Sequence, residues 1–196
     1  MSSDVRKSAG TQGRLKKKRK ESMRIYLSGD ALMSLLISSA EVFKRESLGY
    51  LLGYRLEDRF IIEHAFSLQT ARRKRRGVVL THRDQKRIEP ILSRFEKLQI
   101  VGDFHSHTSY GETKGLPIPS KIDVDGMEPG NLYVIIAVNE KQRSSAWREN
   151  RNGTISGSIE NLFFTISAYL CAGAKDGCKP LKTPIYCSFP PGLRAG

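Results

Sequence analysis

The sequence predicts an α/β (α+β) fold, in which a single domain carries a central mixed β-sheet flanked by helices. Three observations predict it. Apolar residues recur at helical spacing in two segments, short apolar runs alternate with these segments, and further strand-like runs follow late in the chain. Residues 23–196 contain no internal repeat and no second domain boundary, whereas residues 1–22 lack hydrophobic periodicity. We therefore expect a basic disordered tail over 1–22 and one folded domain over 23–196.

The first half of the domain is expected to contain two helices and two strands. The first helix follows Ser28, a suitable N-cap, and its apolar positions are Leu32, Leu35, Leu36, Ala40 and Phe43. Strands are predicted over 49–53, between two glycines, and over 60–66. A second helix is predicted over 88–98, with Pro90 in its first turn, where a missing N–H is tolerated.

The second half is dominated by strands. The strand-like run 100–104 leads into His105, and the glycines, prolines and polar residues of 108–119 predict a loop. A short helix can begin at Ser120. Three more strands are predicted over the segments 132–138, 144–149 and 163–169, with Asn152-Gly153 as a turn signal between the last two.

The composition excludes several classes of protein. Hydrophobic residues make up 39% and charged residues 27%, which is typical of a soluble globular domain. No apolar run approaches the roughly 20 residues of a membrane helix, and the charged N-terminus is unlike a secretory signal. Three cysteines, an odd number, argue against a disulfide framework and for a reducing compartment. We therefore expect a cytoplasmic protein with no membrane contact.

The positive charge is concentrated in two places. Of the formal net charge of +13, residues 1–22 carry +6, and a second basic run, RRKRR, covers residues 72–76. Such runs can contact nucleic acid or an acidic surface. Their commonest meaning is a solvated charge run, and no aromatic residues are interleaved to stack on bases.

His105 and His107 are the first candidate site residues. On a strand, residues i and i+2 point to the same side, so both imidazoles can reach one metal ion. Asp123, at a predicted helix start, can complete a zinc site of two histidines and one aspartate, leaving a fourth position to water. The Ser120–Asp123 spacing is also that of a helix capping box, which needs no metal. The spacing leaves both interpretations open.

Three separated motifs, RESLGYLLG at 45–53, VGDFHSH at 101–107 and SKID at 120–123, together resemble the JAB/MPN domain family with its JAMM metalloprotease motif. The resemblance covers roughly residues 24–172. It implies a sheet layered as in cytidine deaminases, with His105, His107 and Asp123 as ligands of one Zn²⁺ per chain. It also implies that Glu46 is the catalytic glutamate and that Ser120 assists at the oxyanion.

The sequence departs from the family pattern after the second histidine. Thr108 stands where the family usually has proline, and 108–119 supplies twelve residues where seven are usual. Asp125 is therefore an alternative ligand to Asp123, although no serine lies three residues before it. The longer segment can be a substrate gate hinged at Gly111 and Gly115, or an inert surface insertion.

The resemblance implies a zinc-dependent metallopeptidase or isopeptidase that cleaves ubiquitin or ubiquitin-like conjugates or fusions, with water activated by zinc and Glu46. Two alternatives remain: a non-catalytic MPN scaffold, and a basic protein associated with nucleic acid. His64 and His82 are interpreted as surface or core residues. Cys171, Cys178 and Cys187 are interpreted as buried free thiols, because their spacing lacks the C-x-x-C pattern of a second zinc site.

Overall fold

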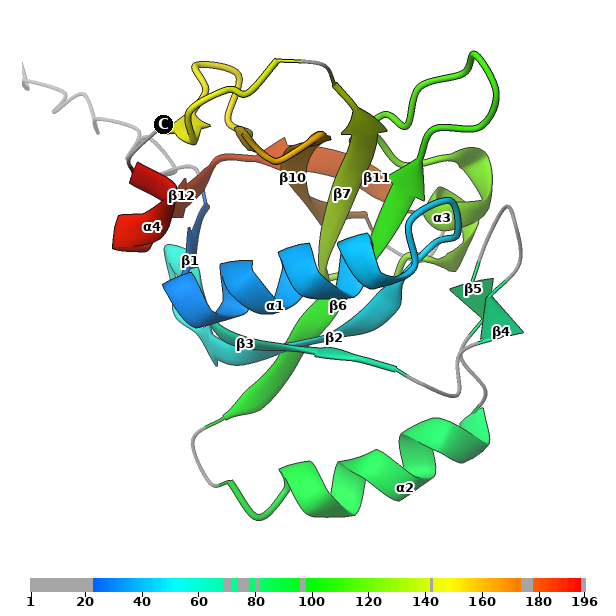
Figure 1. Cartoon of the computed structure of the whole chain (residues 1–196). Helices are drawn as coiled ribbons and strands as arrows, with labels where there is room; N and C mark the ends of the chain where they lie inside the picture. Colours follow the sequence, from blue (N-terminus) through cyan, green and yellow to red (C-terminus); the bar gives the residue numbers. More distant parts are fainter. Residues whose placement is uncertain are drawn as a thin grey trace, which may run out of the picture.

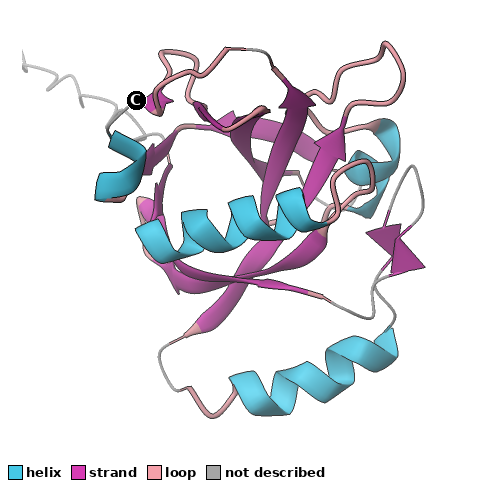
Figure 2. Cartoon of the chain, viewed as in Figure 1, coloured by secondary structure: helices cyan, strands magenta, loops and turns pink. Residues whose placement is uncertain are grey.

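The computed structural model describes residues 23–68, 72–73, 78–79, 82–95, 98–141, 143–173 and 178–194. It confirms the predicted fold class, because a large mixed sheet carries a few helices on its faces (Figures 1 and 2). The tail 1–22 and part of the RRKRR run lie outside the described residues, so the expectation of a disordered tail stays a prediction. No helix among the described residues is long and apolar enough to cross a membrane.

The helices are α1 (Gly29–Glu41), α2 (His82–Leu92), α3 (Lys121–Gly126) and α4 (Pro191–Arg194). The strands are β1 (Arg24–Leu27), β2 (Leu48–Arg55), β3 (Arg59–Ser67), β4 (Arg72–Arg73), β5 (Val78–Val79), β6 (Gln99–Thr108), β7 (Leu132–Glu140), β8 (Arg148–Glu149), β9 (Ile155–Ile159), β10 (Leu162–Ala172), β11 (Lys179–Thr183) and β12 (Ile185–Cys187).

Ten of these strands form one sheet in the order β12-β1-β3-β2-β6-β7-β10-β9-β8, with β11 paired to β10. The β6–β7, β1–β3 and β1–β12 pairs are parallel, and the other pairs of this sheet are antiparallel. The two ends of the sheet approach each other. The Ile185 N–H donates to the Gly153 carbonyl (3.1 Å), and the Cys187 N–H donates to Glu149 Oε1 (2.9 Å). The sheet therefore curls almost into a barrel.

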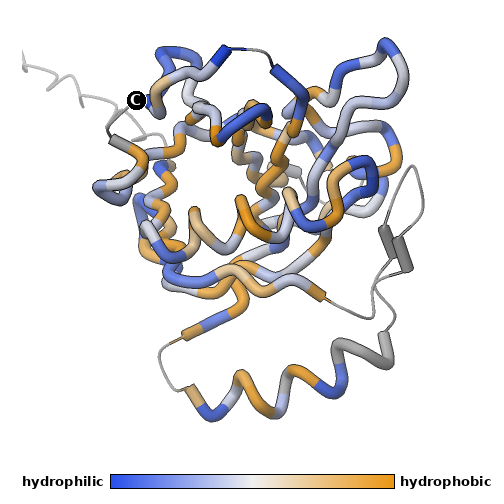
Figure 3. Tube along the Cα trace, viewed as in Figure 1, coloured by the Kyte–Doolittle hydropathy of each residue, from blue (hydrophilic) through white to orange (hydrophobic). Residues whose placement is uncertain are grey.

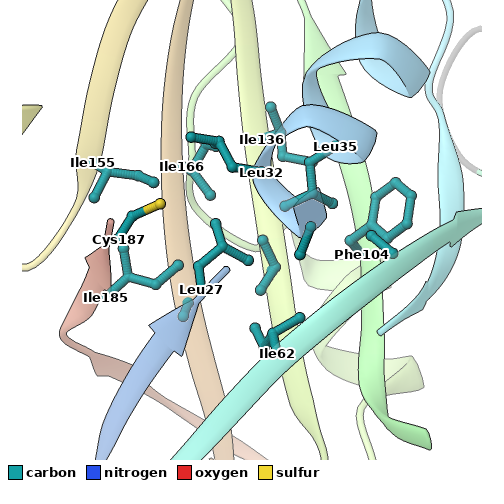
Figure 4. Packing of buried hydrophobic residues seen from close by; sticks show 14 of the residues in the cluster. Leu27, Leu32, Leu35, Ile62, Phe104, Ile136, Ile155, Ile166, Ile185 and Cys187 are labelled. Carbon is teal, nitrogen blue, oxygen red and sulfur yellow. The ribbon is translucent and has the colours of Figure 1, made fainter. Parts of the chain in front are cut away.

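Helix α1 fills the inside of this curl. Its predicted cap is confirmed, because the Ser28 hydroxyl accepts the Ala31 N–H (3.0 Å). Leu32 and Leu35 are fully buried among side chains from several strands that surround the helix, as Figure 4 shows. In Figure 3, hydrophobic segments lie on α1 and on the strands around it, and the surrounding loops are more hydrophilic. This burial is the main stabilising contribution to the fold.

The outer face of the sheet carries two smaller apolar clusters. Ile88 of α2 packs against a group that includes Leu48 and Tyr50 of β2. Met127, at the end of α3, packs against residues of β7 and β10, among them Tyr133 and Tyr169. Because successive strand residues point to opposite faces, β6 and β7 present one set of side chains to α1 and the other to α3.

The second helix is shifted relative to its prediction. It spans His82–Leu92 rather than 88–98, and Pro90 lies in its last turn, not its first. Residues 82–87 contain no apolar residue, so periodicity could not reveal them. Pro90 disfavours helical geometry in the residue before it, and the helix ends two residues later.

Several strands escaped prediction. Periodicity did not reveal β1, β9, β11 or β12, and of the segment 144–149 only Arg148–Glu149 is extended into a strand. The predicted turn at Asn152-Gly153 exists, with Gly153 at φ +80°, but it joins β8 to the unpredicted β9. These strands are short, and tertiary pairing rather than local pattern makes them extended.

The prediction of three free thiols is wrong for two of them. Cys171 at the end of β10 and Cys178 just before β11 form a disulfide, with Cα atoms 5.3 Å apart. The β10–β11 hairpin brings them together, which the sequence spacing alone does not reveal. Cys187 is free and buried, as predicted, and burial raises the pKa of its thiol to about 11.

Candidate metal centre

Strand β6 presents His105 and His107 to the same side, as their spacing predicts. Their Nε2 atoms lie 3.1 Å apart. The strand is held on one side by β7, where His105 pairs with Ile135 and His107 with Ala137. On the other side the β2 ladder ends at the Leu48–His105 pair. The two imidazoles therefore stand at a strand end with rigid support beneath them.

Asp123 reaches the two histidines from α3. Its Oδ1 lies 3.4 Å from His105 Nε2, and its Oδ2 lies 3.4 Å from His107 Nε2. The capping box is also present: Ser120 Oγ accepts the Asp123 N–H (3.2 Å), and Asp123 Oδ2 accepts the Ser120 N–H (2.6 Å). The two interpretations of Ser120 and Asp123 are thus compatible, because the cap is what aims the carboxylate at the histidines.

The Asp123 carboxylate and the His107 imidazole shift each other's pKa values towards their charged forms. Burial alone would raise the pKa of Asp123, but hydrogen bonds from His105, His107 and Ser120 hold that pKa well below its usual range. Burial alone would lower the pKa of His107, yet Asp123, the Leu116 carbonyl and the charge of Glu46 together raise it. The carboxylate is therefore ionised at neutral pH, as a metal ligand must be.

Glu46 comes to the site through a backbone pairing that no local pattern reveals. The next residue, Ser47, is bonded twice to Ser106, which lies between the two histidines. The Ser47 N–H donates to Ser106 Oγ (2.8 Å), and the Ser106 N–H donates to the Ser47 carbonyl (3.0 Å). Both serines are fully buried. This clamp spans 59 positions of sequence and places Glu46 near enough to His107 to act on its pKa.

The remaining predicted residues are placed as follows. Ser120 is exposed at the start of α3, where its hydroxyl oxygen accepts the Asp123 N–H and its side chain also bonds to the Asp123 carboxylate. The alternative ligand Asp125 is exposed and does not belong to the cluster. His64 is an exposed residue of β3, in agreement with its interpretation as a surface residue. The side chain of His82 lies outside the described residues.

Two polar residues near the site were not singled out from the sequence. Asp103 lies on the histidine face of β6, where burial, with added repulsion from Asp123 and Glu128, raises its pKa to about 7. Asn139, near the end of β7, bonds to the backbone of the 108–119 segment. The signal for Asn139 was available, since it is the polar residue that ends the apolar run 132–138.

The cluster fits a zinc ion. One ligand atom from each of His105, His107 and Asp123 lies within 4.8 Å of the others. Two imidazole nitrogens and one carboxylate oxygen are a donor set that zinc takes, with room for a fourth ligand. His107 Nδ1 lies 2.8 Å from the Leu116 carbonyl, so the proton on that nitrogen leaves Nε2 free to bind a metal.

Comparisons with known proteins agree with this architecture. The solution structure of protein DSY2949 from Desulfitobacterium hafniense is similar with a TM-score of 0.55, at 18% identity, and covers 85% of this chain and 94% of its own. At that identity the likeness concerns the fold alone. A search of curated proteins finds no match. Residues 30–150, which include all five predicted site residues, match the family of prokaryotic homologs of the JAB domain. The chain therefore belongs to this JAB-domain family.

Proposed function

We propose that this protein is a zinc-dependent hydrolase that cleaves a peptide or isopeptide bond at the C-terminal end of ubiquitin or a ubiquitin-like protein. The observation that carries the proposal is the meeting of His105, His107 and Asp123 within 4.8 Å, with Glu46 close to His107. Membership of the JAB-domain family supports a hydrolase or a related scaffold. The ubiquitin-like substrate is proposed from the resemblance of the three motifs to the JAB/MPN family.

His105, His107 and Asp123 would hold the zinc. When bound, zinc supplies a Lewis acid that lowers the pKa of a coordinated water to about 7. Ser120 contributes through its backbone as well, because its N–H fixes the Asp123 carboxylate. A ligand held in this way loses little conformational freedom when it binds the ion.

Glu46 is the proposed proton carrier. It takes a proton from the attacking water as the water oxygen forms a bond to the scissile carbonyl carbon. It then gives that proton to the leaving amine as the carbon–nitrogen bond breaks. The Ser120 hydroxyl donates to the oxygen that becomes negative in between, an interaction typically worth about 2.7–4 kcal/mol. The place of this hydroxyl supports that role, since it lies at the start of α3 beside the Asp123 that faces the histidines.

The deciding experiment is a cleavage assay on a panel of ubiquitin and ubiquitin-like fusions and lysine conjugates, with zinc, with a chelator, and after zinc is restored. We expect turnover that the chelator abolishes and zinc restores. Glu46→Gln should keep its zinc and lose activity by roughly 10²–10⁴-fold. Glu41→Gln, at the exposed end of α1, is the matched control and should behave as the wild type.

The outcome also separates the proposal from a non-catalytic scaffold. A scaffold would bind a ubiquitin-like protein with the same affinity in the wild type and in Glu46→Gln, and would cleave none of the panel. Zinc loss in Glu46→Gln would show instead that Glu46 is a ligand or a structural residue.

A nucleic-acid contact through the basic tail is the second candidate, because residues 1–22 carry +6 of the net +13. It predicts DNA or RNA binding that weakens steeply with salt and is lost when residues 1–22 are removed. Equal binding with and without the tail would refute it.

A further inference from the structure

The segment 108–119 divides into two unlike halves. The first half forms a small exposed tip, in which Tyr110 and Thr113 pair as a single bridge and Gly111 takes φ +57°. Nothing lies within 4 Å of a Cβ built on Gly111, so this glycine is required for its positive φ and not for close packing. The second half, 115–119, is instead bonded to the strands of the sheet.

Gly115 is pressed against the end of β6. A Cβ at this position would lie 2.4 Å from the carbonyl oxygen of His107, a distance that real side chains do not reach. The expectation that Gly115 is a second hinge is therefore wrong. Glycine is required here for close approach of two backbones, and the closeness itself restricts motion.

Side chains from β7, β6 and β10 hold three consecutive residues of this half. Asn139 binds Gly115 twice: its Oδ1 accepts the Gly115 N–H (2.8 Å), and its Nδ2 donates to the Gly115 carbonyl (3.0 Å). The Leu116 carbonyl lies 2.8 Å from His107 Nδ1. The Tyr169 hydroxyl donates to the Pro117 carbonyl (2.8 Å). This half of the segment is therefore anchored to three strands of the sheet.

The contact at Leu116 determines the state of a metal ligand. A carbonyl oxygen can only accept, so the Leu116 contact is a hydrogen bond only when His107 carries a proton on Nδ1. In the neutral imidazole, Nε2 then carries the lone pair, and this is the atom that faces His105 and Asp123. A carbonyl that bonds to the outer nitrogen of a histidine ligand fixes its tautomer and ring orientation.

We propose that Asn139 is a positioning residue of the metal centre. It clamps Gly115 so that the neighbouring Leu116 carbonyl stays in line with His107 Nδ1 and keeps Nε2 aimed at the metal position. Asn139 suits this task because it lies on β7 two residues beyond Ala137, the register partner of His107, and so shares its face of the sheet. This inference rests on the proposed zinc site. It also confines any substrate gate to the tip before Gly115.

The test uses two readouts on the full chain. Zinc affinity is measured by competition with a chelating dye. The tautomer of His107 is read from long-range proton–nitrogen NMR correlations of the metal-free protein, in mildly alkaline solution where the imidazole is neutral. Asn139→Ala should weaken zinc binding by about 10–100-fold, as is typical when the support of a metal ligand is removed. It should also shift His107 from the Nδ1–H tautomer towards a mixture.

Asn150→Ala is the matched control. Asn150 also makes two side-chain hydrogen bonds, which it donates to Thr154 and Ser156, but it lies in the turn before β9 and away from the site. It should change neither readout. Should Asn139→Ala fail to fold, Tyr169→Phe provides a second route, because it removes the bond to Pro117 and should shift both readouts in the same direction by a smaller amount.

Zinc affinity within twofold of the wild type together with an unchanged His107 tautomer would overturn the role of Asn139. Failure of the proposed function looks different. A wild type that binds no zinc would refute the zinc hydrolase, whereas the tautomer in the metal-free protein would still decide whether Asn139 positions His107.

Discussion

Ser106→Ala removes one oxygen atom from the contact that brings Glu46 to the histidines. In the folded protein that oxygen accepts the Ser47 N–H at 2.8 Å, and both residues are 0% exposed. Without it, a buried amide is left with no acceptor, which typically costs about 1–3 kcal/mol. For a domain of this size, each kcal/mol lowers Tm by roughly 2–4 °C, so we expect a decrease of about 2–12 °C.

The same change should reduce activity more than stability. Ser47 directly follows Glu46, and its other bond, from the Ser106 N–H, remains. Ser47 is then held to Ser106 by one bond instead of two. A displacement of about 1 Å of a catalytic group can cost roughly 10²-fold in turnover. The zinc content should stay unchanged, because β7 still pairs with β6 along its other side.

The assay combines urea or thermal unfolding, elemental analysis for zinc and turnover on the best substrate of the panel. Ser39→Ala is the control. Ser39 is equally buried and its hydroxyl lies 3.4 Å from that of Ser47, but it does not touch the Ser47 N–H. It should alter stability by less than about 1 kcal/mol and leave turnover intact. Wild-type stability and turnover in Ser106→Ala would refute the reasoning that the Ser47–Ser106 clamp positions Glu46.

Four further outcomes are expected. His107→Ala should lose zinc in elemental analysis while its circular dichroism stays native; full zinc retention would contradict the ligand assignment. The pKa of Asp103 is about 7 in the folded protein against 3.8 for the free side chain, so its stabilising contribution is present below pH about 4 and is lost as pH rises through 7. With a chelator present, the resistance of Asp103→Asn to urea, relative to that of the wild type, should therefore increase from pH 5 to pH 8. A stability difference between the two proteins that is equal at pH 5 and at pH 8 would exclude this linkage. Gly157→Ala puts a Cβ 2.4 Å from the Trp147 ring and should destabilise by about 1–3 kcal/mol in urea unfolding; an unchanged midpoint would contradict it. A chain that starts at Met23 should melt within a few degrees of the full chain, and a much larger fall would mean that residues 1–22 dock.

Hydrophobic periodicity predicted the elements in which the apolar positions of the sequence are also the buried positions of the structure. Helix α1 is an example, since Ser28 caps it and Leu32 and Leu35 recur at the spacing that faces the core. The pattern failed for α2, because the polar residues of its first half carry no apolar signal. The short strands β1 and β12 failed for a related reason: the edge strand β12 pairs with β1, which lies far from it along the chain, and β1 pairs with β3 on its other side.

The sequence by itself determined which side chains are the candidate ligands and two of their relationships. His105 and His107 share a side because strand residues alternate, and Ser120 and Asp123 interact because they are three apart at a helix start. These are local relations, set by the repeat of the backbone over a few residues.

Only the tertiary structure decided which distant residues meet. It placed Asp123, and not Asp125, beside the two histidines, and it paired Cys171 with Cys178. It also brought Glu46 close to His107 through the Ser47–Ser106 clamp, and it brought Asn139 into contact with Gly115. Each of these contacts depends on the register between strands and on the course of a loop. The register is set by the whole curled sheet closing around α1, so no short window of sequence contains it.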